Sequence, residues 1–309
     1  MAGLEVESVQ PCALDFAGVS VARIESVQPH PQDAKLQVCE IDNGGSGKTV
    51  VSAAANLRAG MHVALAGAGA RLAGDKPITA ATIKGVVSAG MLCSAQDLGL
   101  EESSTSILEL PGDLQPGSDL ATLCGGGDSV FDLAITPNRG DCLSLAGIAR
   151  EIAVLNQMTL RAPSLTEIPP VTNKRRRVHL DAAEDCPHYA GRVIEKVDVT
   201  RPAPLWLTLR LQRCGIRSIN AVVDITNYVM LELGQPMHAF ADECLAGGIH
   251  VRRAAQGEAL TLLDGKDYTL DEGALVIADD HKVLAMAGVM GGEDSAVTAD
   301  SRTIFLESA

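Results

Sequence analysis

One glycine-rich segment carries residues that could bind a phosphate. Gly47-Lys48-Thr49 matches the end of a P-loop, whose backbone N–H groups and lysine hold nucleotide phosphates. The first glycine of that motif would fall at position 42, which is Asp42, and a strand rather than a helix is expected after the lysine. We therefore reject a phosphate site here. The sequence also lacks HExxH, GxSxG and EF-hand patterns, so it offers no familiar metal or nucleophile motif.

The eight cysteines do not form a metal-binding pattern. They occur singly, with no CxxC pair and no cysteine–histidine cluster at zinc spacing. Scattered single cysteines are typical of reduced thiols in cytoplasmic proteins. The apolar runs around 63–70 and 283–292 are too short and too rich in glycine to cross a membrane, and residues 1–15 lack a signal-peptide pattern. We expect a cytoplasmic protein with no bound metal and no membrane contact.

Charge is distributed unevenly along the chain. The formal net charge of −14 argues against a protein that coats nucleic acid by bulk charge. Residues 1–128 carry 7 basic and 15 acidic side chains, whereas residues 174–217 carry 10 basic and 5 acidic ones. The basic segment has two interpretations: a solvated linker and helix face, or a face that contacts RNA phosphates.

The first half of the chain has the pattern of a small β domain. The 309 residues are 46% apolar but only 3% aromatic, which favours two or three domains with aliphatic cores. Short strands alternate with glycine turns, a pattern that predicts a barrel or sandwich and fits an OB-like barrel of about 100 residues. A hairpin loop is expected at 42–47, and strands are expected at 19–27, 35–41, 49–52, 62–66, 83–87 and 106–109.

The second half predicts helices followed by a mainly antiparallel sheet. After a strand at 130–135, Asp141 is expected to cap a helix that runs through Asn156. Residues 162–173 contain three prolines and predict a linker. The expected elements beyond it are a strand at 189–197, a helix opened by Thr200 and Pro202 and closed by Gly215, a helix at 221–233 ended by Gly234, and strands at 249–253, 259–263, 274–278, 283–287 and 303–307.

Several blocks of sequence closely resemble one family, the β subunit of bacterial phenylalanyl-tRNA synthetase. Four blocks in the second half carry the resemblance: 214–218 (CGIRS), 224–228 (DITNY), 232–240 (ELGQPMHAF) and 287–293 (AGVMGGE). Three more lie upstream: 31–36 (PQDAKL), 90–94 (GMLCS) and 135–142 (ITPNRGDC). The resemblance therefore extends over essentially the whole chain, in order.

The resemblance implies a multidomain architecture. A β-barrel OB-fold is inserted in a small α/β N-terminal domain, and an α+β editing domain follows. The expected boundaries are 1–15 plus 128–161 for the N-terminal domain, 16–127 for the tRNA-binding-type OB-fold, 162–175 for the linker and 176–309 for the editing domain. The resemblance also implies that the chain is cut at both ends, with Ala309 inside the editing domain.

An editing function follows from the same resemblance. A pocket shaped for phenylalanine rejects tyrosine only about 100-fold, because an added hydroxyl is weakly penalised. A second site that hydrogen-bonds the hydroxyl reverses this preference. The resemblance therefore implies tRNA binding and hydrolysis of mischarged Tyr-tRNA(Phe), within a ligase that attaches phenylalanine to its tRNA.

The resemblance also implies cofactors and partners for the parent enzyme. That enzyme uses ATP and Mg²⁺, and its α subunit carries out aminoacylation in an (αβ)₂ heterotetramer. The present segment is expected to bind no cofactor itself. The alternative function is a non-catalytic module that binds tRNA or docks a subunit.

By motif position, Glu307 resembles the residue that accepts the tyrosine hydroxyl. A carboxylate suits an O–H donor in an apolar pocket. His238 resembles the editing-site histidine, which could orient the attacking water or hold the terminal adenosine. Thr226 and Asn227 offer short polar groups for the ester or ribose. The ordinary alternatives are a strand-end glutamate, a hydrogen-bonded loop histidine and polar residues on a helix surface.

Small residues and arginines complete the expected site. Ala287 and Gly291 would let a substrate approach the backbone closely, although strand-end turns use the same residues. Backbone N–H groups of the turn 288–292 could stabilise an oxyanion, so the implied mechanism is ester hydrolysis by a positioned water without a side-chain nucleophile. The candidate tRNA contacts are arginines, which could equally be exposed charges: Arg177, Arg213 and Arg217.

Overall fold

A computed structural model describes residues 3–45, 47–74, 76–101 and 103–309 of the protein, so Ser46 of the expected loop at 42–47 lies outside the described residues. The chain divides into two compact units. One consists of Val6–Leu133 and Pro204–Leu209, and the other of the residues up to Glu5, Ala134–Ala203 and Arg210–Ala309. Within the described residues, no helix is both long and apolar enough to span a membrane.

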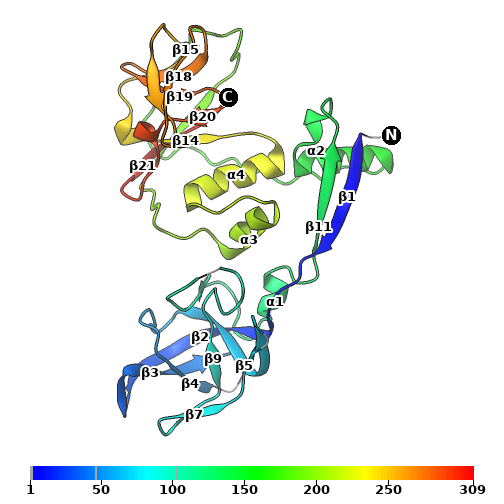
Figure 1. Ribbon diagram of the computed structural model, residues 1–309, viewed down its shortest axis with the longest axis vertical. Helices are drawn as coiled ribbons and strands as arrows, with labels where there is room; N and C mark the ends of the chain where they lie inside the picture. The colour runs from blue at the N-terminus through cyan, green and yellow to red at the C-terminus, as the bar shows by residue number, and fades with distance from the viewer. Residues whose placement is uncertain (1–2, 46, 75, 102) are drawn as a thin grey trace. The chain divides into compact units, whose positions relative to one another are not determined.

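The first unit is built on one antiparallel sheet, whose strands curl around a shared core (Figure 1). The central strand β2 (Ala17–His30) has two register shifts in its pairing with β3 and one in its pairing with β5, and bulges of this kind bend and twist a strand. The described pairings do not close the sheet into a barrel. Its order is β10 (Glu109–Leu110), β5 (His62–Leu72), β2, β3 (Asp33–Asp42) and β4 (Lys48–Ser52), and β6 (Lys76–Pro77) and β9 (Gly90–Leu92) also pair with β5.

The prediction of a single strand at 83–87 is wrong. The chain instead forms a hairpin from β7 (Ala81–Ile83) and β8 (Val86–Ser88). Lys84 and Gly85 sit at its tip with φ of 44° and 86°. Two consecutive positive φ values are the geometry of a tight hairpin turn, so the apolar run reverses direction in its middle.

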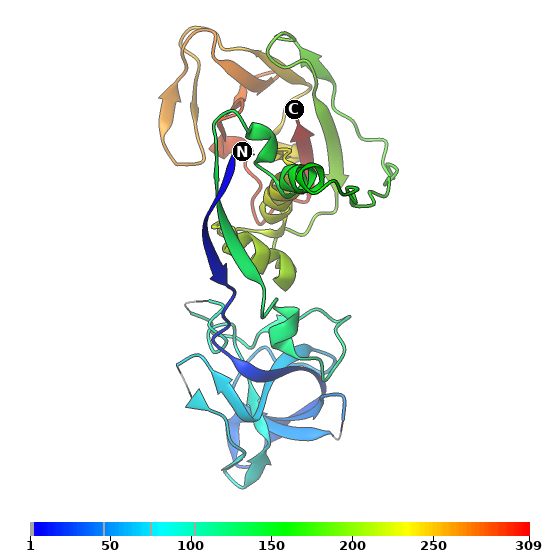
Figure 2. The same ribbon diagram turned by 90° about the vertical axis from the view of Figure 1, so that its right-hand side faces the viewer.

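A two-stranded ladder pairs the beginning of the chain with a distant segment. β1 (Leu4–Pro11) lies beside β11 (Ser129–Ile135), as both views show (Figure 1, Figure 2). The short helix α1 (Leu120–Leu123) precedes β11 in the chain. The strand expected at 130–135 is confirmed as β11.

The helix expected from Asp141 begins later. Gly140–Cys142 form a 3-10 turn, and α2 (Leu145–Leu155) starts at Ser144, whose Oγ accepts the N–H of Gly147 at 3.1 Å. The Asp141 carboxylate binds Arg139 instead of capping the helix. The helical spacing of the apolar residues is confirmed, but much of that face is exposed: Leu145 is 59% accessible and Leu155 is 60% accessible.

The second unit contains two sheets that pack face to face. Phe240 and Phe305 of the three-stranded sheet share one core with Val251, Ile277 and Leu284 of the five-stranded sheet. Pairing is antiparallel except between β12 and β15. The first sheet has the order β13 (Ala190–Glu195), β21 (Thr303–Ser308), β14 (His238–Ala241); the second has the order β12 (Val178–Leu180), β15 (Ile249–Arg253), β18 (Leu275–Asp279), β19 (Val283–Met286), β20 (Met290–Gly291). A separate hairpin joins β16 (Ala259–Thr261) and β17 (Asp267–Thr269), and short 3-10 turns lie at Asp242–Cys244 and Glu293–Ser295.

Helix α4 (Ala221–Leu233) has the bounds that the sequence predicted. Asn220 accepts the N–H groups of Val222 and Val223, and Gly234 ends the helix with a φ of 82°. Helix α3 (Leu205–Arg213) begins after the expected Thr200, because the residue before Pro204 is pushed out of helical geometry.

One glycine is required by the packing of the three-stranded sheet. A Cβ on Gly191 of β13 would collide with the ring of Phe305, which is 1% exposed. The ring fills the space that a side chain at position 191 would need.

We predict that Gly191→Ala destabilises the protein by about 1–3 kcal/mol, the usual cost of overpacking a core. The matched control is Gly67→Ala, because Gly67 lies in a strand with open space around its Cβ position. Urea unfolding measures both variants. Equal effects would show that Phe305 does not constrain position 191.

Candidate functional site

Glu307 and His238 lie side by side on the three-stranded sheet. In the central strand β21, Glu307 is directly opposite His238 on β14 and Gly191 on β13. Directly opposite residues share a face of a sheet. Two residues away, Phe305 and Phe240 are paired in the same way and lie in the inter-sheet core. The carboxylate and the imidazole therefore sit at the edge of that core, on its side of the sheet.

A cavity of about 440 Å³ opens at this edge, within the range of small-molecule sites. Its wall is mainly apolar, with Glu307 and His238 among its few ionisable groups. The apolar side chains come mainly from the five-stranded sheet, with one just before β14 and one just after β19: Met237, Val251, Leu275, Ile277, Ala285, Met286 and Ala287. The space suits an apolar group that carries one polar atom.

Burial raises the pKa of Glu307 to about 7, against a hydrogen bond from Tyr189 that lowers it. The Tyr189 hydroxyl donates to Glu307 Oε2. Burial and the adjacent carboxylate raise the pKa of Tyr189 well above its usual range, so the phenol keeps its proton. Near neutral pH the carboxyl group is thus divided between its charged and neutral forms.

His238 contributes a neutral imidazole with an unused nitrogen. Burial lowers the pKa of His238 below its ordinary value. Its Nε2 is buried and has no hydrogen-bond partner among the described residues. The ring meets Phe240 edge to face, with centroids 4.6 Å apart. Such an atom is free to hydrogen-bond a ligand or a water.

Gly291 is needed by this imidazole. A Cβ on Gly291 would lie 2.5 Å from His238 Cε1, too close for any side chain. The absent side chain of Gly291 therefore makes room for His238.

The structure brings together four of the six residues expected at the editing site. Their positions around the cavity are His238, Ala287, Gly291 and Glu307. Thr226 and Asn227 do not line it. Thr226 is buried on α4, and its Oγ1 donates to the carbonyl of Val223 at 2.8 Å, so this hydroxyl serves the helix.

The turn at 288–292 retains few backbone donors for a ligand. Val289 N–H donates to Met286 O at 3.1 Å, and Gly292 N–H donates to Leu284 O at 2.7 Å. Gly288 lines the cavity, and its N–H has no acceptor within the described part of the chain. Gly288 is thus the better-placed donor of this turn.

The expected tRNA contacts lie on the second unit, away from its buried core. Arg177 and Arg217 are exposed, and Arg213 ends α3 half-buried. Their neighbour Arg176 is committed to the fold, because it binds the Asp242 carboxylate and the Gly247 carbonyl. The basic segment therefore mixes structural and solvent-facing charges.

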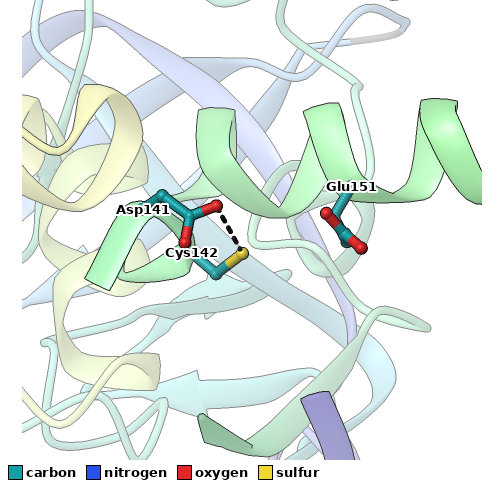
Figure 3. A group of neighbouring side chains, drawn as sticks. All are labelled: Asp141, Cys142 and Glu151. Atoms are coloured by element: carbon teal, nitrogen blue, oxygen red, sulfur yellow. Dashed lines mark hydrogen bonds between the residues drawn. The ribbon is translucent and has the colours of Figure 1, made fainter. Parts of the chain in front are cut away.

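A second cluster of polar side chains lies where α2 begins. Asp141, Cys142 and Glu151 bring ligand atoms within 4.8 Å of one another (Figure 3). Arg139 Nη2 contacts all three, at 3.0 Å from Asp141, 2.9 Å from the Cys142 sulfur and 2.8 Å from Glu151. This guanidinium holds the pKa of Asp141 at about 2. A cation already occupies the cluster, which ties the ITPNRGDC segment to α2 as an ion-pair network.

Sequence reasoning missed Tyr189 as a site residue. It lies 118 positions from the carboxylate that it contacts, just before β13. A lone tyrosine before a strand carries no local signal of such a contact.

Two family sequence models match the chain. The model described as a putative tRNA binding domain matches residues 19–119, and the B3/4 domain model matches residues 185–309. Over its full length the chain is 48% identical to the phenylalanine–tRNA ligase beta subunit of Methylococcus capsulatus and 50% identical to that of Pseudomonas fluorescens. It spans 39% of the length of each.

A solved structure also matches, weakly. The N-terminal fragment of the phenylalanyl-tRNA synthetase beta-subunit from Pyrococcus horikoshii aligns with 59% of this chain and 56% of its own. The identity is 17% and the TM-score is 0.35, too low to bear on the fold. The full-length sequence matches decide the relationship: the chain belongs to the family of phenylalanine–tRNA ligase beta subunits.

Proposed function

We propose that the cavity around Glu307 hydrolyses tyrosine wrongly attached to tRNA(Phe). One observation carries the proposal: a partly charged carboxylate lies in a largely apolar cavity of about 440 Å³. An aromatic side chain fits apolar walls, and a phenolic hydroxyl supplies the donor that the carboxylate accepts. A phenylalanine ring would leave the buried acceptor unpaired, which disfavours the correct product.

We assign to His238 the activation of the attacking water. A neutral imidazole nitrogen can accept a proton from water as the water attacks the ester carbonyl carbon. The ester C–O bond then breaks, the proton passes to the ribose oxygen, and free tyrosine and tRNA are released. The Gly288 N–H is the donor that we assign to the developing oxyanion. Thr226 and Asn227 keep a proposed role at the ribose side only, because neither lines the cavity.

The properties of the whole enzyme are proposals as well, since the chain spans 39% of its relatives. We propose that the parent enzyme is a cytoplasmic ligase that uses ATP and Mg²⁺, with an α subunit as partner in an (αβ)₂ heterotetramer. Neither ATP nor Mg²⁺ is assigned to this chain. The support is the name of the relatives, phenylalanine–tRNA ligase beta subunit.

We also propose the expected domain boundaries, with an OB-type barrel at 16–127, a small domain at 1–15 plus 128–161, a linker at 162–175 and the editing domain at 176–309. Two contacts between β4 and the β8 region support barrel closure. Ala89 N–H donates to Thr49 O at 2.9 Å, and Val51 N–H donates to Ser88 Oγ at 3.1 Å. The family model at 19–119 lies within the same boundaries.

A docking module without hydrolytic activity is the second candidate function. The exposed apolar face of α2 favours it, because Leu145, Ile152 and Leu155 are each at least half accessible. The two functions are compatible, and the assay below separates them.

We predict that the purified chain deacylates Tyr-tRNA(Phe) faster than Phe-tRNA(Phe). Glu307→Gln should reduce this ratio about 10- to 100-fold, the worth of a hydrogen bond to a buried charge. His238→Ala should slow both substrates equally, and His281→Ala, which changes an exposed histidine of the same unit, should change neither. Measurement of both rates for the four proteins decides; absence of release by the wild type would favour the docking module.

We predict that Arg177→Ala combined with Arg217→Ala weakens tRNA binding and lowers its salt dependence. Each lost phosphate contact reduces the slope of log K against log salt by about 0.7–0.9. Filter binding at several salt concentrations measures this, with Lys266→Ala, an exposed lysine paired with Asp264, as control. An unchanged slope would place these two arginines outside the interface.

We predict that Glu307→Gln is more stable than the wild type at pH 8 and equally stable at pH 4. The pKa of Glu307 is raised to about 7 in the folded chain, so its contribution to stability is full below about pH 4.3 and is lost as pH rises towards 7. The neutral glutamine escapes that loss, a gain of about 3 kcal/mol at pH 8. Urea unfolding of both proteins at the two pH values tests it; a pH-independent difference would contradict it.

A further inference from the structure

The Glu307 carboxylate is only half used by its own chain. Tyr189 donates its hydroxyl to Oε2, and no hydrogen bond to Oε1 is found among the described residues. A carboxylate accepts hydrogen bonds at both oxygens. The chain's own phenol, that of Tyr189, therefore occupies one oxygen of the carboxylate. The other oxygen remains for the ligand phenol that we propose enters the cavity.

Tyr189 is itself held by buried packing. Its ring stacks with that of Phe305, with centroids 6.5 Å apart and planes 15° apart. Phe305 is fixed in the core and occupies the space left by Gly191. Phe305 and Glu307 belong to the same strand, β21. This strand therefore supplies both the ring that packs against Tyr189 and the carboxylate that accepts its hydroxyl.

We propose that Tyr189 is a positioning residue: its hydroxyl fixes the Glu307 carboxylate so that Oε1 is left as the acceptor for the hydroxyl of a ligand phenol in the cavity. The identity of the ligand, a tyrosyl ester, rests on the proposed function. The effect of Tyr189 on the orientation and ionisation of Glu307 does not.

The hydrogen bond from Tyr189 matters because it affects the charge state of Glu307. Burial favours the protonated acid, which can donate as well as accept and so discriminates poorly between ligands with and without a hydroxyl. A phenol that donates to the carboxylate favours the charged form, which only accepts. Tyr189 lowers the pKa of Glu307 against the effect of burial.

The first test observes Glu307 directly in the full chain. Carbon NMR of side-chain-labelled glutamate follows its titration, with Glu307→Gln to assign the signal. We expect a wild-type midpoint near pH 7 and a higher midpoint in Tyr189→Phe. Tyr268→Phe is the matched control, because it removes a phenol that donates to Asp264 at an exposed hairpin. An unchanged midpoint in Tyr189→Phe would overturn the proposal.

The second test measures the ratio of Tyr-tRNA(Phe) to Phe-tRNA(Phe) deacylation. Tyr189→Phe should lower the ratio about 3- to 10-fold at pH 7, and Tyr268→Phe should leave it unchanged. In the Glu307→Gln background, Tyr189→Phe should have no further effect on the ratio, because it acts through the carboxylate. This double variant lacks the buried charge, so it also gives a reading if Tyr189→Phe alone folds poorly.

The outcomes separate the two proposals. A wild-type chain without deacylation contradicts the proposed function, and the NMR midpoints then decide the role of Tyr189 alone. A higher ratio in Tyr189→Phe would mean that its phenol competes with the ligand, which overturns the positioning role. Equal slowing of both substrates, with an unchanged ratio and midpoint, would reduce Tyr189 to a packing residue.

Discussion

A carboxylate placed in an apolar cavity must either neutralise itself or find a donor, and the second unit is arranged around that constraint at Glu307. Burial raises its pKa to about 7, and the phenol of Tyr189 partly offsets the effect. The phenol is held by Phe305, whose ring lies where a side chain at Gly191 would be. The packing of Phe305 at Gly191 thus affects, through Tyr189, the ionisation of Glu307.

The glycines near the cavity serve the side chains around it. Gly191 accommodates an aromatic ring and Gly291 accommodates the imidazole of His238. Each leaves room for a large ring where a Cβ would exclude it. The shape of the cavity is therefore set in part by the imidazole of His238 packed against Gly291.

Local rules predicted the elements whose signals are local. Helix α4 has its expected bounds because Asn220 and Gly234 act on neighbouring backbone groups. Asp141 failed as a helix cap because its carboxylate binds Arg139, which also reaches Glu151 on α2. Strand β14 escaped prediction because its four residues are extended only through pairing with β21.

The candidate site likewise contains residues that the sequence could indicate and one that it could not. The resemblance of short blocks led to His238 and Glu307, and the structure places them opposite each other. Whether they are correctly assigned to editing stays a prediction. Tyr189 could not be found, because its partner lies 118 residues away and hydrogen bonds between distant side chains leave no periodicity.

The position of β21 has a consequence for synthesis. In the described strand pairings, β13 and β14 are joined into one sheet through residues 303–308, which are the centre of the sheet but leave the ribosome after both neighbours. Until then the two outer strands expose unpaired edges, and non-local strand pairing of this kind is slow. A pause in translation before residue 303 would therefore lengthen the time during which these edges can pair with another chain.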